Sequence, residues 1–171
     1  MVKKYTKQEL KQKGKRLLKD GCALVDTSGR TKQIKEKSVL ALASKSINFT
    51  VLMFSSEKKK VLNKLMKRNT QQRAFAIMHS VKLYYALKDY VEILPAFYIC
   101  CDGFDRGLLK YYLRSFLNIK YHDKKINIEM SLKPLFGKRN IADRLGKKVN
   151  KEGKPPTMIL NEKHFKDLNL I

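Results

Sequence analysis

The sequence predicts an α/β protein, and three observations support this class. Short apolar runs rich in β-branched and aromatic residues, such as 97–101, are typical of buried strands. Longer segments, such as 104–118, repeat apolar residues at helical spacing. The two kinds of segment alternate in the second half of the chain. The predicted order of elements is therefore β-β-β-α-β-α-β-α, with about five strands.

The composition indicates a globular, strongly basic protein. The 171 residues are about the length of one domain, and 43% of them are hydrophobic, which excludes a disordered chain. Lys and Arg number 38 against 15 Asp and Glu, so the net charge is +23. We expect a polyanionic partner, DNA or RNA, because a charge of this size attracts phosphate. No apolar span of about 18 residues is present, so no membrane segment is expected.

The cysteine and histidine pattern favours a reducing compartment and excludes a zinc site. Two of the three cysteines are adjacent, Cys100 and Cys101, and point to opposite faces of the expected strand. The three histidines are scattered without metal-ligand spacing. The first twenty residues lack the apolar core of a signal peptide. We therefore expect a cytoplasmic protein, and the sequence does not indicate its oligomeric state.

The chain divides into a basic lead-in segment and one larger domain. Residues 1–20 are rich in Lys and Arg and are interpreted as an N-terminal helix or arm. Lys15 and Arg16 in this segment either contact phosphates or simply keep the segment solvated. Residues 21–171 are interpreted as a single domain.

The domain begins with an expected antiparallel meander of strands. The first run, 21–26, ends in Asp26 and is followed by turn residues at 27–30. Two further strands are expected within 31–43 and 47–54.

Helices and strands then alternate to the end of the chain. A helical region covers 57–90, with a possible break at Asn69 and Thr70, and the other expected elements follow in this order: a strand at 97–102, a helix at 104–118, a strand at 125–130, a helix at 139–150 and a short strand or helix within 157–171.

Three acids stand at notable places in this order. Asp26 ends the first strand in Ala23-Leu24-Val25-Asp26-Thr27-Ser28-Gly29. Asp102 ends the strand at 97–102, and Asp143 lies in the last long helix in Asn140-Ile141-Ala142-Asp143-Arg144-Leu145. Such carboxylates, carried on rigid elements, are the oxygen ligands that hard divalent cations prefer.

The element order and these motifs resemble the ribonuclease H-like superfamily of nucleases. The resemblance implies a mixed five-stranded sheet (β-β-β-α-β-α-β-α) flanked by helices, in which Asp26, Asp102 and Asp143 are catalytic and hold Mg²⁺ or Mn²⁺. Two such ions can clamp both sides of an in-line displacement at phosphorus. Residues 57–90 offer acids only at their ends, so the chain is more similar to the integrase and resolvase branch than to a classical ribonuclease H.

Each acid also has a structural interpretation. Asp26 precedes turn residues, and a turn aspartate bonds backbone amides. Asp102 is also expected to cap the helix that begins near Phe104. Asp105, in the first turn of that helix, is either an alternate metal ligand or the acid that the helix dipole favours there. Asp143 is either a ligand or a solvated acid of an early helical turn.

Basic residues before the last helix are candidates for phosphate contacts. Lys133, Lys138 and Arg139 would lie on the same rim as the acids if the resemblance holds. Solubility is the alternative role for their charges.

Two functions from different classes follow. The first is a metal-dependent nuclease acting on DNA, RNA or a hybrid. The second is a non-catalytic, basic nucleic-acid-binding protein, ribosome- or RNA-associated, whose acids are structural. Both bind polyanions with an affinity that falls with salt. Only the first requires that the three acids come together.

Overall fold

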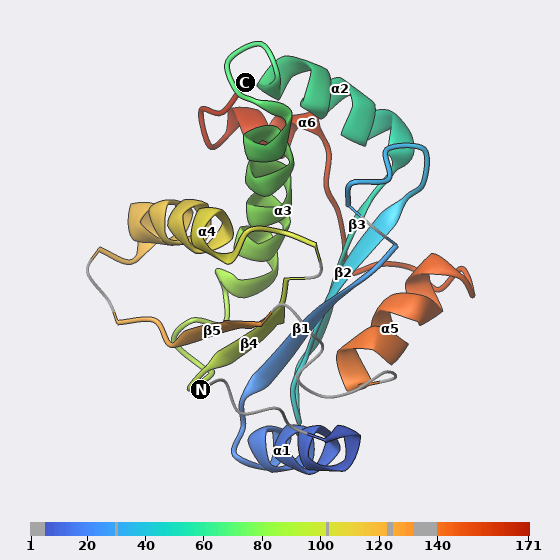
Figure 1. Ribbon diagram of the computed structural model, residues 1–171, viewed down its shortest axis with the longest axis vertical. Helices are drawn as coiled ribbons and strands as arrows, with labels where there is room; N and C mark the ends of the chain where they lie inside the picture. The colour runs from blue at the N-terminus through green and yellow to red at the C-terminus, as the bar shows by residue number, and fades with distance from the viewer. Residues whose placement is uncertain (1–5, 30, 102, 123–124, 132–139) are drawn as a thin grey trace.

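The chain folds around one six-stranded sheet with helices on both faces (Figure 1). The computed structural model describes residues 6–29, 31–101, 103–122, 125–131 and 140–171. The strands are β1 (Ala23–Ser28), β2 (Ser38–Ala43), β3 (Asn48–Met53), β4 (Phe97–Cys100), β5 (Ile128–Ser131) and β6 (Met158–Ile159). Their order across the sheet is β5-β4-β1-β2-β3-β6.

The sheet is mixed, and β2 alone runs against the others. β1, β2 and β3 form an antiparallel meander, in which Val25 pairs with Leu42 and Leu40 with Val51. β4 is parallel to β1, β5 is parallel to β4, and β6 is parallel to β3. The C-terminal ends of β1 and β4 therefore meet at the same edge of the sheet.

Within the described residues, six helices connect and cover these strands. They are α1 (Lys7–Lys19), α2 (Ser55–Leu65), α3 (Gln71–Leu87), α4 (Arg106–Lys120), α5 (Ile141–Asn150) and α6 (Glu162–Lys166). α2, α3 and α4 lie on one side of the sheet, and α5 lies on the other (Figure 1).

Side chains alternate between the two faces of the sheet along each strand, and each face packs against a different set of helices. Val25 of β1 belongs to the large core under α3, whereas its neighbour Leu24 packs with Ala142 of α5. The side-chain period of a strand is two, so residues 24, 26 and 28 share the α5 face. This alternation places Asp26 on the side of the sheet that α5 covers.

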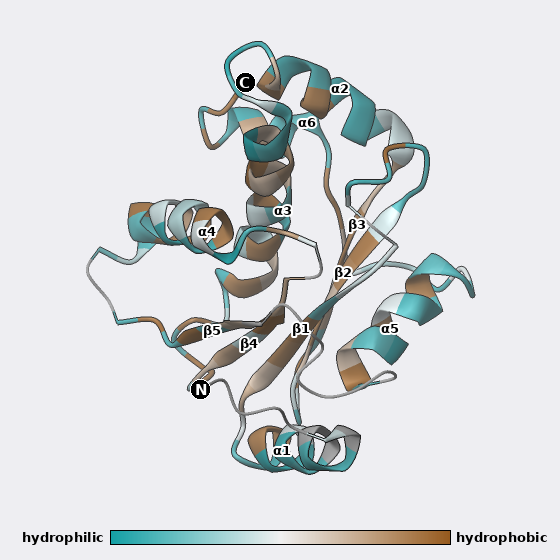
Figure 2. Cartoon of the chain, in the orientation of Figure 1, coloured by the Kyte–Doolittle hydropathy of each residue, from teal (hydrophilic) through white to brown (hydrophobic). Residues whose placement is uncertain are grey.

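The central helix α3 is buried all round, because α2, α4 and the sheet surround it. Every residue from Ala74 to Leu87 is buried, and the helix has no polar face (Figure 2). Its buried polar residues are His79, Ser80 and Lys82. Buried polar groups require partners, so these residues mark a built polar region inside the apolar layer.

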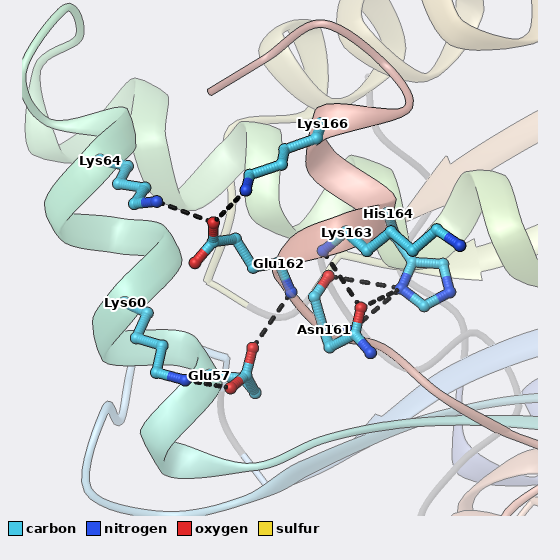
Figure 3. Close-up of polar contacts among 8 residues, drawn as sticks. All are labelled: Glu57, Lys60, Lys64, Asn161, Glu162, Lys163, His164 and Lys166. Atoms are coloured by element: carbon cyan, nitrogen blue, oxygen red, sulfur yellow. Dashed lines mark hydrogen bonds and ion pairs between the residues drawn. The ribbon is translucent and has the colours of Figure 1, made fainter.

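The C-terminal helix α6 is fastened to α2 by side-chain contacts (Figure 3). Glu57 accepts a hydrogen bond from the backbone N–H of Glu162 at 3.1 Å. Glu162 in turn forms ion pairs with Lys64 at 2.7 Å and Lys166 at 3.0 Å. Hydrogen bonds from these two lysines lower the pKa of Glu162 to about 2. The end of the described chain is thereby held against the α3 layer.

The α/β class predicted from the sequence is confirmed, with two differences of detail. The described residues form six strands where five were expected, because 158–159 pairs with the edge of β3. β1 continues to Ser28 where a turn was expected, so Asp26 lies within the strand and not at its end. The break expected at Asn69 and Thr70 is confirmed: Asn69 donates to the Leu65 carbonyl at the end of α2, and Thr70 caps α3. The basic segment at the N-terminus contains the helix α1.

Candidate functional site

A cleft of about 560 Å³ opens at the C-terminal end of β1. One wall comes from α5, the other from the loop that joins β1 to β2, from the middle of α3 and from the segment before α4. The lining residues are Thr27, Ser28, Gly29, Thr31, Gln33, Glu36, His79, Cys100, Phe104, Asp143, Lys147, Asn150 and Lys151. Parallel strands of an open α/β sheet place their ligand sites at this end.

Asp26 lies at the base of this region, with both carboxylate oxygens engaged. Its Oδ2 accepts a hydrogen bond from Asn140 Nδ2 at 3.0 Å, and its Oδ1 accepts one from the Thr27 N–H at 2.8 Å. Burial raises the pKa of Asp26, and repulsion from Asp143 adds to the rise, while the hydrogen bonds from Asn140, Thr27 and Cys100 oppose it. The carboxylate is therefore positioned where its negative charge is not fully compensated.

Asp143 lies in the first turn of α5 and is linked to Asp26 through Asn140. Asn140 is the N-cap of α5: its Oδ1 accepts from the Asp143 N–H at 2.9 Å, while its Nδ2 holds Asp26. Asp143 Oδ2 forms an ion pair with Lys147 Nζ at 2.7 Å, and its side chain is only 17% exposed. One amide side chain thus fixes the strand acid relative to the helix that carries the second acid.

Small residues let α5 approach the sheet closely enough for this arrangement. Ala142 is fully buried on the sheet side of α5, and a Cβ added at Gly146 would stand 3.1 Å from Ser28 Cβ. The buried face of α5 consists of Ala142, Gly146 and Val149, whereas Ile141 and Leu145 are only partly buried.

The opposite wall is held by two buried lysines. Lys58 Nζ donates to the carbonyls of Gln33 and Glu36 at 3.1 and 2.7 Å. Lys82 Nζ donates to the hydroxyls of Thr31 and Ser38 at 2.9 and 2.8 Å. Burial lowers the pKa of Lys58 to about 8 and lowers that of Lys82 well below its usual value. These contacts fix the loop that forms one side of the cleft.

The predicted site residues have different outcomes. Asp26 and Asp143 are joined through Asn140 beside the cleft. Asp102 lies outside the described residues, two positions beyond the end of β4, and its role stays a prediction. Asp105 is exposed and is the N-cap of α4, accepting from the Leu108 N–H at 2.8 Å. It therefore precedes the first turn, in which it was expected, and has the capping role that was expected of Asp102.

The predicted phosphate contacts are only partly within the described chain. Lys15 and Arg16 are exposed on α1, which lies by the start of β1, whereas the cleft lies at its end (Figure 1). Lys133, Lys138 and Arg139 lie outside the described residues. Their contact with phosphate stays a prediction.

Several lining residues were not anticipated from the sequence. Lys147 follows Asp143 at the i+4 spacing of a helical ion pair, so this partner had a readable signal. No sequence pattern indicated His79, since it lies within a long apolar helix. No pattern distinguished Lys58 or Lys82 from the other basic residues either, because the chain has 38 of them.

The donor set beside the cleft suits a hard cation. Asp26 and Asp143 supply carboxylate oxygens that repel each other, and a divalent cation relieves that repulsion. Among residues 6–29, 31–101, 103–122, 125–131 and 140–171, no group of three or more His, Cys, Asp and Glu is close enough to hold a metal ion. Of the three predicted ligands, only Asp26 and Asp143 lie within the described residues, and metal binding stays a prediction.

Comparison with known proteins leaves the site to be interpreted on its own geometry. No family model, no curated protein and no solved structure matches the chain. Within the part of the chain that is described, no helix is both long and apolar enough to cross a membrane.

Proposed function

We propose that the chain is a metal-dependent nuclease that cleaves the phosphodiester backbone of DNA, RNA or a hybrid. The observation that carries the proposal is that Asn140 joins Asp26 on β1 to Asp143 in the first turn of α5, beside a cleft in a chain of net charge +23. Two acids that are distant in sequence but close together in the fold are typical of a site in which both bind the same ligand.

The arrangement of the sheet supports a ribonuclease H-like fold for this enzyme. A three-strand antiparallel meander is followed by β4 and β5, each parallel to β1 and reached through helices. The acids on the first strand and the last long helix, Asp26 and Asp143, support the same proposal. The integrase and resolvase branch fits best, because α2 and α3 carry no acid inside them apart from Glu57 in the first turn of α2.

Each side chain at the site has a separate proposed role. Asp26 and Asp143 would hold Mg²⁺ or Mn²⁺, with Asp102 as the third ligand that the sequence predicts. When bound, the metal supplies Lewis acidity at phosphorus and lowers the pKa of an attacking water. Asn140 orients Asp26, and Lys147 limits the repulsion between the two acids. Lys147 and Lys151 add positive charge where a phosphate enters the cleft.

A non-catalytic nucleic-acid binder is the second candidate. It is favoured by the fact that both acids already have partners: Asn140 for Asp26 and Lys147 for Asp143. In that case the acids stabilise the junction between β1 and α5, and the positive charge alone provides the function.

Cleavage of labelled nucleic acids separates the two candidates. We expect the wild type to cut at least one of single-stranded DNA, duplex DNA, RNA or an RNA–DNA hybrid with Mg²⁺ or Mn²⁺, and not with EDTA. Asp26→Asn and Asp143→Asn should each lower the rate at least about 100-fold, the order expected when a group that stabilises charge in the transition state is removed. Both variants should still bind the substrate.

Asp105→Asn is the matched control, because this exposed acid only caps α4. It should cut at close to the wild-type rate. Binding of all four substrates without cleavage by the wild type under either metal would instead establish the non-catalytic function.

A further inference from the structure

Two buried polar atoms of the described residues have no hydrogen-bond partner, and both belong to residues that line the cleft. They are Thr27 Oγ1 and His79 Nε2. Buried polar groups are paired in the great majority of cases, since an unpaired one costs about 1–3 kcal/mol. The occurrence of both in one cleft indicates that their partner is a ligand.

The hydrogen bonds around His79 determine which of its nitrogens carries the proton. Lys82 Nζ donates to Thr31 Oγ1, and Thr31 Oγ1 lies 3.2 Å from His79 Nδ1. Thr31 is 1% exposed, so its hydroxyl hydrogen needs a buried acceptor, and Nδ1 is the acceptor that these contacts offer. Nδ1 therefore accepts, and Nε2 carries the hydrogen and donates.

The imidazole is also held rigid and neutral. It is 1% exposed and stacks on Phe104, with ring centroids 4.5 Å apart and ring planes inclined by 12°. Burial lowers the pKa of His79 well below its usual value, and the charge of Lys82 lowers it further. Because this neutral N–H is already fixed in place, little conformational entropy is lost when it donates to a ligand.

Thr27 presents a hydroxyl from the end of β1, next to Asp26. Its backbone N–H is bonded to the Asp26 carboxylate, so the position of the residue is coupled to that of the acid. Its hydroxyl takes no part in that contact and can donate to an oxygen in the cleft.

We infer that Thr27 Oγ1 and His79 Nε2 are neutral hydrogen-bond donors to an oxygen of the bound nucleic-acid backbone. They position that backbone in the cleft, which Asp143 also lines. Phosphate and the ribose 2′-hydroxyl both offer such an oxygen. The assignment rests on the proposed nucleic-acid ligand and names the residues that hold it, whichever of the two candidate functions applies.

Thr27→Val tests the hydroxyl with little change of shape. Removing an unpartnered buried hydroxyl should leave the melting temperature equal or higher. In EDTA, affinity for fluorescently labelled DNA and RNA duplexes should fall about 3- to 10-fold, the loss expected for one hydrogen bond. Equal losses on both duplexes identify a phosphate oxygen, and a loss confined to RNA identifies the 2′-hydroxyl.

Thr50→Val is the matched control, because Thr50 Oγ1 has a partner: it accepts from the Thr157 N–H at 2.9 Å, at the junction of β3 and β6. This variant should show the opposite pattern, with a lower melting temperature and unchanged affinity. Unchanged affinity of Thr27→Val on both duplexes would overturn the role of Thr27.

Imidazole ¹H–¹⁵N spectra of the wild type test His79 without a mutation. His79 should show the neutral form protonated at Nε2, and its Nε2 signal should move on addition of either duplex. The more exposed His122 and His164 serve as internal references. A His79 signal that stays fixed while the duplex binds overturns the inference and leaves the proposed function standing. Failure of the wild type to bind any duplex removes both.

Discussion

At the scale of single residues, Asp26 shows how a strand position changes the chemistry of a carboxyl group. Its side chain shares the α5 face with Leu24, where solvent is largely excluded. Burial and Asp143 raise its pKa, whereas Asn140 only partly offsets them. A site that holds a cation gains from this arrangement, because the ion binds most strongly where negative charge is least compensated.

Asp26→Asn should change how stability depends on pH. A raised carboxyl pKa means that the folded wild type binds more protons than the unfolded chain above the usual value of 3.8, so its stability falls as pH rises through that window. The variant lacks this loss. In urea unfolding without divalent metal, the free energy of unfolding of the variant relative to wild type should therefore increase from about pH 4 to pH 7.

Asp105→Asn serves as the comparison, since its carboxylate is exposed at the start of α4. A constant difference between Asp26→Asn and wild type across this range would show that burial of the charge has no energetic effect.

At the scale of elements, the loop between β1 and β2 is held by lysines from two helices. Lys58 of α2 bonds two of its carbonyls, and Lys82 of α3 bonds Thr31. A backbone loop that lines a cleft needs such anchors, because its polar groups cannot all reach water or a sheet partner. The same anchors orient His79 through Thr31.

The Lys58 amine should make the protein more stable in mild alkali. Its folded pKa of about 8 is below its usual value of 10.5, so between these values the unfolded chain binds more protons. The contribution of this group to the free energy of unfolding therefore rises as pH increases from about 8 to 10.5. Guanidinium unfolding across that range should show a positive slope.

Lys58→Met should reduce that slope. Lys64→Met, which removes an exposed lysine of the same helix, should retain it. An equal slope in wild type and Lys58→Met would contradict the low pKa of the buried amine.

At the scale of the whole molecule, the positive charge is spread well beyond the cleft. Lys147 and Lys151 line it, whereas Lys15 and Arg16 lie on α1 at the other end of β1. Phosphate contacts add over a long polyanion, so both groups can act on one nucleic acid. Under the proposed function, the net charge of +23 would set affinity and the acids would set chemistry.

Affinity for duplex DNA should fall steeply with salt, and each phosphate contact should add about 0.9 to the slope of log K against log salt concentration. Lys151→Gln and Arg16→Gln should each lower the slope by about 1 if the residue contacts a phosphate. Lys64→Gln is the control, because Glu162 already pairs with this lysine. A slope equal to wild type in both test variants would restrict binding to other basic residues.

Local patterns were sufficient for most of the fold. Strand alternation and the apolar stripe of α4 each reflect interactions between near neighbours, and the order of elements followed from them. The turn expected at 27–30 was wrong for Thr27 and Ser28, because both pair with β2 as part of β1. The edge strand β6 was harder to predict from the sequence, because a strand of two residues is too short to show an alternating pattern. The burial of α3 on all sides was also beyond local reasoning, because it depends on how many neighbours surround a helix.

The candidate site was likewise only partly predictable from the sequence. The sequence by itself determined a basic α/β chain with acids at the ends of predicted elements, because composition and periodicity are properties of the chain alone. Only the tertiary structure decided that Asn140 joins Asp26 to the helix of Asp143, that Asp105 is a cap, and that His79 and Thr27 face one cleft. The physical reason is that desolvation and hydrogen-bond partners arise from residues distant in sequence, and these set the chemistry of each side chain.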